Sequence, residues 1–327
     1  MIKVSVIIPV YNGEKYIKQC LDSILKQTLE QIEIIIINDA SSDATSEILQ
    51  DYGSIYTDKI KIVHNKQNEG QGKSRNIGIN IAKGEFITFI DADDEIEQNM
   101  LEKMYNCAKN KNADLVLCDY YEIRKNKKVM IKSIPEKTLN IKKDYSVYIA
   151  SPWGKLIKTE LLTKNELKFL EIEAYEDISL MPVLSAYTDK IVYIEKPLYI
   201  YYVRDGSTMR QKVFNHKLLS IYDALENLVR CFEKTKMLDN YKEELEFIYI
   251  KHLLYGGAGR FLEYKEGRKE ISKIVYIIKN KYPNWKKNKY YQKQDKLFKL
   301  NCNIFYSNKL FIIVPFRTLI NHRKKHK

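Results

Sequence analysis

The first third of the chain alternates short apolar runs with amphipathic stretches, a pattern typical of βαβ units and a mostly parallel sheet. The apolar runs predict strands at Val4–Ile8, Glu33–Ile37, Lys61–His64, Phe86–Ile90 and Leu115–Cys118. The amphipathic stretches predict helices at Glu14–Gln27, Asp43–Tyr52, Gln71–Ala82 and Glu97–Asn110. Open sheets of this class bind ligands at the carboxyl ends of their strands, so we expect a ligand site in the polar loops after the first, second and fourth strands.

The pattern changes after residue 120. A lysine-rich stretch, Arg124–Lys143, leads to Ser151–Gly154, and a short helical pattern surrounds Tyr175–Ala186. From Asn215 onward the periodicity is helical, at Leu218–Lys234, Tyr241–Tyr264 and Arg268–Lys281. We therefore predict an α/β domain over residues 1–212, with halves 1–120 and 121–212, a helical region over 213–280, and a basic, aromatic tail over 281–327.

The composition is that of a globular protein, with 327 residues, 45% of them hydrophobic and 30% charged. The net charge of +13 is a C-terminal feature, because residues 281–327 hold 13 basic side chains and one acidic one. The five cysteines are scattered and form no Cys-x-x-Cys pair, which argues against a disulfide framework or a cysteine zinc site and suits a reducing cytosol. No apolar run reaches the ~20 residues needed to span a bilayer, and the first apolar run is too short for a signal peptide.

Two polar loops are candidates for holding a planar base. In the loop from Pro9 to Gly13, the Tyr11 ring can lie against a base and Asn12 can open the next helix. The polar cluster Asn38–Asp43 directly follows four isoleucines. Its Asp39 can accept a hydrogen bond from a pyrimidine imide, while Ser42 or Asp43 caps the next helix. An ordinary strand-loop-helix junction is the alternative at each position.

A glycine-rich loop leads into the start of the third predicted helix, Gln71–Ala82. It runs from Asn68 to Gly78, and its glycines permit close backbone approach while Lys73 and Arg75 favour an anionic ligand. The loop is neither a Walker A sequence nor Gly-x-Gly-x-x-Gly, which argues against P-loop NTPases and dinucleotide oxidoreductases.

The strongest constellation is the acidic turn Asp91-Ala92-Asp93-Asp94, which comes directly after a buried strand. Carboxylates so close repel one another unless a cation joins them. Because side chains two residues apart on an extended chain point to the same side, Asp91 and Asp93 can meet one hard cation such as Mg²⁺ or Mn²⁺. A solvated turn that caps a helix is the alternative.

Together these segments resemble family 2 of the inverting, nucleotide-sugar-dependent glycosyltransferases, whose fold is the Rossmann-like GT-A domain and whose metal motif is Asp-x-Asp. The resemblance is close over residues 1–120 and looser up to residue 212. It implies that Tyr11 and Asp39 hold the uracil of a UDP-sugar and that Asp93, with Asp91, binds the Mg²⁺ or Mn²⁺ that bridges the phosphates. The nucleotide-sugar contacts that it implies are Pro9, Tyr11, Asn12, Asp39, Asn68, Arg75, Asp91, Ala92 and Arg204.

The resemblance also implies an acceptor side. The pair Glu176-Asp177 stands at the start of a predicted helix, and the family pattern makes Asp177 the general base, with Glu176 and Glu173 as rivals. Trp153 resembles a residue that lines the acceptor site, although an ordinary core tryptophan is the alternative. No Gln-x-x-Arg-Trp motif of processive synthases is present, so we expect transfer of one sugar per encounter to a glycan or lipid-linked saccharide of a cell-surface polysaccharide.

Two further expectations concern partners and alternatives. The basic tail with its aromatic residues suits peripheral attachment to an anionic membrane at the cytoplasmic face, whereas nucleic acid is not expected because no RNA-binding motif is present. A sugar-nucleotidyltransferase and a catalytically silent module that binds nucleotide sugars or glycans are the alternative functions. The first would need a glycine-rich, basic signature that the loop Pro9–Gly13 does not supply.

Overall fold

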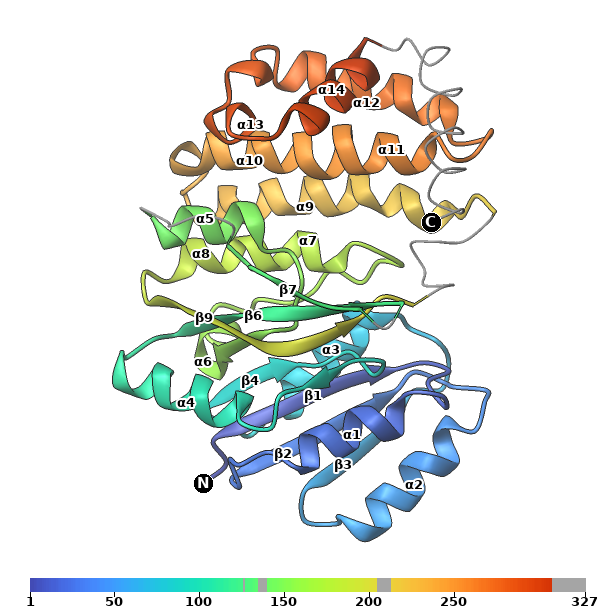
Figure 1. Cartoon of the computed structure of the whole chain (residues 1–327), viewed down its shortest axis with the longest axis vertical. Helices are drawn as coiled ribbons and strands as arrows, with labels where there is room; N and C mark the ends of the chain where they lie inside the picture. The colour runs from blue at the N-terminus through green and yellow to red at the C-terminus, as the bar shows by residue number, and fades with distance from the viewer. Residues whose placement is uncertain (126, 135–139, 205–212, 308–327) are drawn as a thin grey trace. The chain divides into compact units, whose positions relative to one another are not determined.

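In the computed structural model of the chain, the apolar runs of the first third form strands of one mixed sheet (Figure 1). The structure describes residues 1–125, 127–134, 140–204 and 213–307. The chain divides into two compact units, Met1–Asp205 with Glu226–Thr235, and Gly206–Leu225 with Lys236–Lys327. We call the first the α/β unit and the second the helical unit.

The sheet of the α/β unit is parallel in its N-terminal half and mixed beyond it. Its strands are β1 (Val4–Val10), β2 (Ile32–Asn38), β3 (Ile60–His64), β4 (Phe86–Phe89), β5 (Glu95–Ile96), β6 (Leu115–Arg124), β7 (Lys127–Ile131), β8 (Lys155–Lys158) and β9 (Ile191–Tyr202). Their order is β3-β2-β1-β4-β8-β6-β9-β5, with β7 beside β6. Strand β8 runs antiparallel to both β4 and β6 and so joins the two halves.

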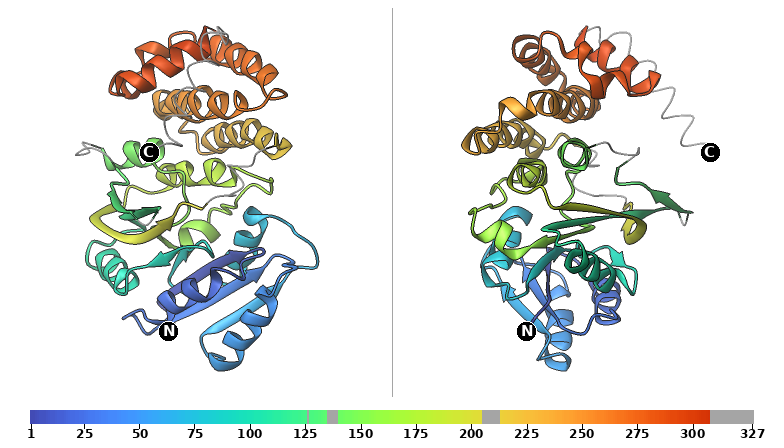
Figure 2. Two further views of the ribbon diagram at one scale, coloured as in Figure 1. Left: turned by 45° about the vertical axis from the view of Figure 1, so that its right-hand side comes forward. Right: turned by 90° about the vertical axis from the view of Figure 1, so that its left-hand side faces the viewer.

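Helices cover the sheet because its central strands are apolar on both faces. Figure 2 shows α1 and α2 beside the N-terminal strands. The helices of this unit are α1 (Ile17–Leu25), α2 (Thr45–Ile55), α3 (Gln71–Ile81), α4 (Met100–Asn110), α5 (Ile141–Tyr148), α6 (Thr159–Thr163), α7 (Glu176–Leu180) and α8 (Leu184–Tyr187). Helix α1 buries Ile17, Cys20, Leu21 and Ile24, as its periodicity predicts. The predicted α/β fold with a mostly parallel sheet, followed by a helical region, is thus confirmed.

The helical unit begins with a 3₁₀ turn at His216–Leu219 and includes the first part of α9 (Ser220–Lys234). A continuous helical stretch follows as α10 (Lys242–Tyr249), the π-helical turn η5 (Ile250–Gly257) and α11 (Ala258–Phe261). The later helices are α12 (Arg268–Lys281), α13 (Lys289–Gln292) and α14 (Lys296–Tyr306). None of the helices in the described part of the chain is long and apolar enough to cross a membrane.

Four aromatic residues of the predicted tail correct one expectation. Trp285, Tyr290, Tyr291 and Phe305 are buried, with at most 4% of each side chain exposed, so they belong to the core of the helical unit and cannot sit at a membrane interface. Burial is favoured because large aromatic side chains dominate core energetics, and Trp285 packs edge-on against Tyr291 with ring centroids 4.8 Å apart. Phe311 and Phe316 lie outside the described residues.

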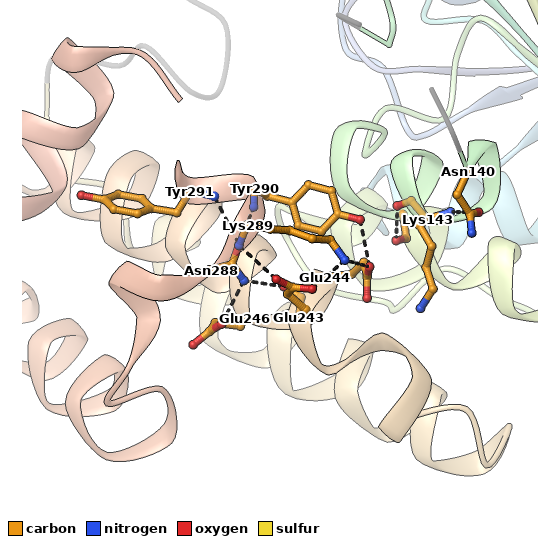
Figure 3. Close-up of polar contacts among 10 residues, drawn as sticks. Asn140, Lys143, Glu243, Glu244, Glu246, Asn288, Lys289, Tyr290 and Tyr291 are labelled. Atoms are coloured by element: carbon orange, nitrogen blue, oxygen red, sulfur yellow. Dashed lines mark hydrogen bonds and ion pairs between the residues drawn. The ribbon is translucent and has the colours of Figure 1, made fainter. Parts of the chain in front are cut away.

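A buried polar network fixes this C-terminal segment to α10 (Figure 3). The Asn288 side chain accepts hydrogen bonds from the backbone N–H groups of Tyr290 and Tyr291, which caps α13. Its amide also donates to the Glu243 carbonyl at 2.7 Å and to Glu246 Oε2 at 2.9 Å. Because buried polar groups are costly unless paired, this network specifies one position for α13 on α10.

Candidate active site

Parallel register brings three of the predicted site segments to one edge of the sheet. Val10 at the end of β1 lies opposite Asn38 at the end of β2, and Ile7 of β1 lies opposite Phe89 at the end of β4. The residues that follow these strand ends are Tyr11, Asp39 and the turn from Asp91. Pro9 is buried within β1, opposite Ile37, and Tyr11 is 52% exposed, so its ring is accessible for stacking.

The first two loops are hydrogen-bonded to each other. Asn12 adopts a left-handed backbone conformation with φ of 51°, and its Oδ1 accepts from the backbone N–H of Ser42 at 2.8 Å. The N–H of Asn12 donates to Ser41 Oγ at 3.0 Å. Asn12 therefore holds the loops after β1 and β2 together, a role that the sequence did not indicate.

Asp39 is buried and organises the glycine-rich loop. Its Oδ1 accepts from Asn65 Nδ2 at 2.7 Å and from the N–H of Glu69 at 2.9 Å, and its Oδ2 accepts from the N–H of Gly70 at 2.8 Å. Asn68 lies exposed on the same loop. The carboxylate thus fixes the glycine-rich loop, for which the sequence predicts an anionic ligand, and contact of Asp39 with a base stays a prediction.

The three carboxylates of the acidic turn have different partners. Asp94 is buried and accepts hydrogen bonds from the Tyr199 hydroxyl at 2.7 Å and the N–H of Tyr202 at 2.9 Å, so it latches the turn to β9. Asp91 Oδ1 pairs with Arg75 at 3.0 Å. Burial, and then the charge of Asp91, raise the pKa of Asp93 to about 6, whereas Arg204 lowers it.

Asp93 therefore occupies a position that a bound cation would stabilise. Ala92, partly exposed, separates it from Asp91. Within the described residues, no three or more His, Cys, Asp or Glu side chains group closely enough to hold a metal ion by themselves. Mg²⁺ characteristically uses one or two protein carboxylates and completes its shell with substrate phosphates and water, so this turn fits a cation that binds together with a diphosphate.

Arg75 connects the acidic turn to the predicted base segment. The guanidinium is buried, with 1% of the residue exposed. Its Nη1 donates to Glu176 Oε1 at 2.5 Å, and its Nη2 donates to Asp91 Oδ1 and Gln71 Oε1, both at 3.0 Å. The sequence predicts that Arg75 meets the donor, whereas in this structure it joins two carboxylates from distant parts of the chain. We call this arrangement of Asp91, Arg75 and Glu176 the Arg75 clamp.

Close packing of α3 makes the Arg75 clamp possible. A side chain at Gly72 would place its Cβ 2.6 Å from the Leu170 carbonyl oxygen and 3.2 Å from the Glu176 Cβ, so glycine is needed for this approach. Asn76, one residue after Arg75, exchanges two hydrogen bonds with the backbone of Phe169, at 2.8 and 2.9 Å. Helix α3 is thus bonded along one side to the segment that leads to α7.

Glu176 and Asp177 stand in different environments at the start of α7. Glu176 is neutralised by Arg75, which removes it as a free base. Asp177 accepts a hydrogen bond from the backbone N–H of Ile178 at 2.8 Å. Burial, and then the charge of Glu176, raise the pKa of Asp177 to about 7, against the lowering effect of Arg75. Glu173, the other rival, is exposed.

An aromatic cluster forms around Trp153, which is partly exposed. Its indole stacks on Tyr199 and Tyr201, with centroids 4.6 and 5.4 Å apart and interplanar angles of 13°. Tyr120 meets the indole edge-on at 4.9 Å. The tyrosines of β9 therefore already stack on the indole, so a sugar would meet the remaining surface of the cluster.

Two basic side chains border these groups. Arg204 donates from Nη2 to the Asp93 carbonyl at 2.9 Å, and its guanidinium carbon lies 4.1 Å from the Tyr16 ring centroid and 4.5 Å from that of Tyr202. This position beside the acidic turn suits the predicted phosphate contact. Lys155 is buried and donates to the Trp153 carbonyl at 2.7 Å, and burial lowers its pKa to about 7.

The sequence analysis placed Asp94 in the acidic turn without a role of its own and did not identify Tyr199 and Tyr202 as residues that shape the site. A signal for Tyr199 was its alternation with Tyr201, which is typical of a strand with one aromatic face. The predicted residues Tyr11, Asp39, Asp91 and Asp93 do gather near one edge of the sheet, and Arg75 connects Asp91 to Glu176 beside Asp177.

Comparison with known proteins gives a consistent answer. The family described as "Glycosyl transferase family 2" matches residues 5–165. The chain is 31% identical over 271 residues to the glycosyltransferase GlyG of Streptococcus pneumoniae, which covers 75% of this chain and 89% of that protein. It is also 32% identical over 257 residues to the poly(ribitol-phosphate) beta-glucosyltransferase of Bacillus spizizenii, covering 76% of this chain and 39% of that larger protein.

Solved structures agree on the fold. The crystal structure of residues 1–349 of S. aureus TarS in complex with UDP-GlcNAc superposes with a TM-score of 0.74 at 23% identity, covering 97% of this chain and 92% of that 1–349 chain. A mannosyltransferase from Pyrobaculum calidifontis, in complex with GDP-Man and Mn²⁺, gives a TM-score of 0.55 at 15% identity, covering 93% and 86%. The fold is therefore shared with enzymes that were crystallised with nucleotide sugars.

The Arg75 clamp predicts a large loss of stability when its cation is removed. Arg75→Gln leaves Asp91 and Glu176 without their shared partner, so we expect the free energy of unfolding to fall by about 3–5 kcal/mol. Lys73→Gln, on the same helix, removes an exposed pair with Glu69 and should leave the unfolding midpoint unchanged. Urea denaturation followed by circular dichroism measures both, and equal midpoints for the two variants would contradict the clamp.

The match in sequence covers the α/β unit from Ser5 to Asn165, and the similarity to GlyG extends over most of both chains. The strand-end loops, the acidic turn and the Glu176-Asp177 pair are the features by which the sequence resembles that family. The chain therefore belongs to family 2 of the glycosyltransferases and is a glycosyltransferase.

Proposed function

We propose that this enzyme moves one sugar from a UDP-sugar to a hydroxyl of a glycan, polymer or lipid-linked saccharide in surface polymer synthesis, with inversion at the anomeric carbon. The observation that carries the proposal is the Arg75 clamp, because one buried cation joins the acidic turn beside the donor edge to the segment of the candidate base. Arg75 would thereby hold the proposed metal-binding turn and the proposed general base at a fixed distance from each other.

The donor assignment rests on the loops at the sheet edge. Tyr11 offers an exposed ring for the base, and Asp39 holds the loop that carries Asn68. Arg204 stands beside the acidic turn, where its charge would meet a diphosphate. The structural similarity to TarS, crystallised with UDP-GlcNAc, supports uracil as the base of the donor.

The acidic turn is the proposed metal site. Asp93, together with the second oxygen of Asp91, would hold Mg²⁺ or Mn²⁺ against the donor diphosphate. When bound, the cation supplies charge stabilisation for the departing UDP. Asp94 takes no part in this, because its carboxylate is committed to Tyr199 and Tyr202. Arg75 holds Asp91 Oδ1 in place and so orients that carboxylate.

Asp177 is the proposed general base. Its raised pKa, about 7, suits a group that takes a proton from a sugar hydroxyl near neutral pH, because base catalysis is most efficient when the pKa lies near the working pH. Glu176 is held by Arg75 and positions the segment instead. An inverting displacement needs such a base on the face opposite the leaving group, as the family resemblance implies.

The acceptor is proposed to meet the aromatic cluster of Tyr120, Trp153 and Tyr201. Sugars present apolar C–H faces that pack on aromatic rings, and all three rings are partly exposed. The relative named poly(ribitol-phosphate) beta-glucosyltransferase supports a polyol-phosphate or related surface polymer as the acceptor class.

Replacing the base tests this function. Asp177→Asn keeps the size of the side chain but removes the proton acceptor, so transfer from a UDP-sugar should fall by about 10²–10⁴-fold while UDP affinity is retained. Glu173→Gln is the matched control and should keep full transfer. A panel of UDP-sugars with polymer and lipid-linked acceptors gives the rates, and calorimetry gives the affinity. Transfer by Asp177→Asn within about tenfold of wild type would move the base elsewhere.

The pH profile provides a second prediction. Asp177 must be deprotonated to act, so kcat/KM should fall as the pH drops below about 7. Glu176 raises the pKa of Asp177 by its negative charge, and Glu176→Gln removes that charge. The acid limb of the profile should therefore move to lower pH in Glu176→Gln and stay in place in Glu173→Gln. A shift to higher pH in Glu176→Gln contradicts the assignment.

A further inference from the structure

Helix α14 exposes an apolar stripe on the face opposite its core contacts. Phe298, Cys302 and Phe305 are buried in the helical unit. On the other face, Leu297 is 62% exposed and Leu300 is 55% exposed. These two leucines are three residues apart on the helix and therefore lie on one side of it, and the partly exposed Ile304 continues the stripe one turn further on. We call Leu297, Leu300 and Ile304 the leucine stripe.

Basic side chains flank the leucine stripe. Lys296 is exposed at the first position of α14, and Lys293, just after α13, is also exposed. Residues 281–307 contain seven lysines and one acidic residue, Asp295, a net charge of +6. The sequence after them, residues 308–327, adds six basic residues and no acidic one. The leucine stripe thus lies within a strongly basic part of the sequence.

The combination of charge and apolar exposure selects one partner class. A second copy of this face would bring like charges together, which disfavours self-association. A nucleic acid backbone would satisfy the lysines but would leave the leucines in water. An anionic lipid surface satisfies both, since its headgroups attract lysines and its acyl boundary accepts leucine side chains.

We propose that the leucine stripe and the lysines beside it dock the helical unit onto an anionic membrane surface. The contact is made by the exposed face of α14 rather than by Trp285, Tyr290, Tyr291 and Phe305, because these four aromatic residues are buried. Docking goes beyond the proposed transfer reaction, and it would place the enzyme where a lipid-linked acceptor is found. Truncation at residue 280 cannot test it, because that would remove the buried Trp285 and Phe305 and disrupt the helical unit.

Vesicle sedimentation of the full chain tests the proposal. Wild-type protein should bind vesicles of mixed phosphatidylglycerol and phosphatidylcholine, and should not bind phosphatidylcholine alone. Leu297→Ser with Leu300→Ser should weaken that binding by about tenfold or more, because two apolar side chains lose their insertion. Lys293→Gln with Lys296→Gln should weaken it by about tenfold and reduce its dependence on salt.

A matched control is Ile55→Ser, which removes another apolar side chain, 69% exposed, from α2 of the α/β unit. It should bind vesicles as wild type does. All variants change exposed positions, so their unfolding midpoints and their transfer to a water-soluble acceptor should match wild type. Equal vesicle binding by wild type and the leucine variant contradicts the proposal. So does a wild-type dimer in light scattering that becomes monomeric in that variant, since the stripe would then meet a second copy.

Discussion

The active-site region depends on one buried cation that lies between two carboxylates. A guanidinium removed from water is destabilising unless both its charge and its N–H groups are satisfied. Asp91 from the end of β4 and Glu176 from α7 balance the charge of Arg75, and together with Gln71 they accept hydrogen bonds from its Nη1 and Nη2. Its Nε finds no hydrogen-bond partner among the described residues. The two carboxylates belong to different halves of the α/β unit, so the halves must pack closely before the charge of Arg75 is balanced. Gly72 and Asn76, on the same helix, provide that close packing.

The same constraint sorts the acidic residues into separate tasks. Asp94 accepts hydrogen bonds from β9, and Glu176 forms an ion pair with Arg75. One oxygen of Asp91 also pairs with Arg75. Burial and neighbouring carboxylates raise the pKa values of Asp93, Asp94 and Asp177. Of these three, Asp94 is already held by Tyr199 and Tyr202, which leaves Asp93 and Asp177. Raised pKa values in such a cluster indicate functional groups, and here one suits a cation and the other a proton. The different partners of these neighbouring carboxylates thus give them different chemical roles.

Much of the fold was predictable because its signals are local. The isoleucine run of β2 and the helical spacing in α1 locate their elements within a few residues. Strands β8 and β9 were not predicted, since they are stabilised by pairing with β4 and β6 far away in the sequence. The buried tail aromatics were misjudged for the same reason. Their helical neighbours, which remove them from water, are not visible in a local stretch of lysines and tyrosines.

The site was predictable in its residue types but not in its connections. Asp91 and Asp93 follow a buried strand, a local signal that the structure retains. The partner of Arg75, in contrast, is 101 residues away, and nothing in the spacing distinguishes a donor contact from a clamp. Likewise, nothing in the spacing of the acidic turn indicates that Asp94 accepts a hydrogen bond from the Tyr199 hydroxyl, 105 residues away.

The most direct test of the central claim is calorimetric titration of UDP, GDP and dTDP, each with and without Mn²⁺, into wild type and Asp93→Asn. A UDP-sugar enzyme with its cation at the acidic turn should prefer UDP, bind it more tightly with Mn²⁺, and lose that metal dependence in Asp93→Asn. Absence of nucleotide binding under every condition, or unchanged metal dependence in the variant, would contradict the account.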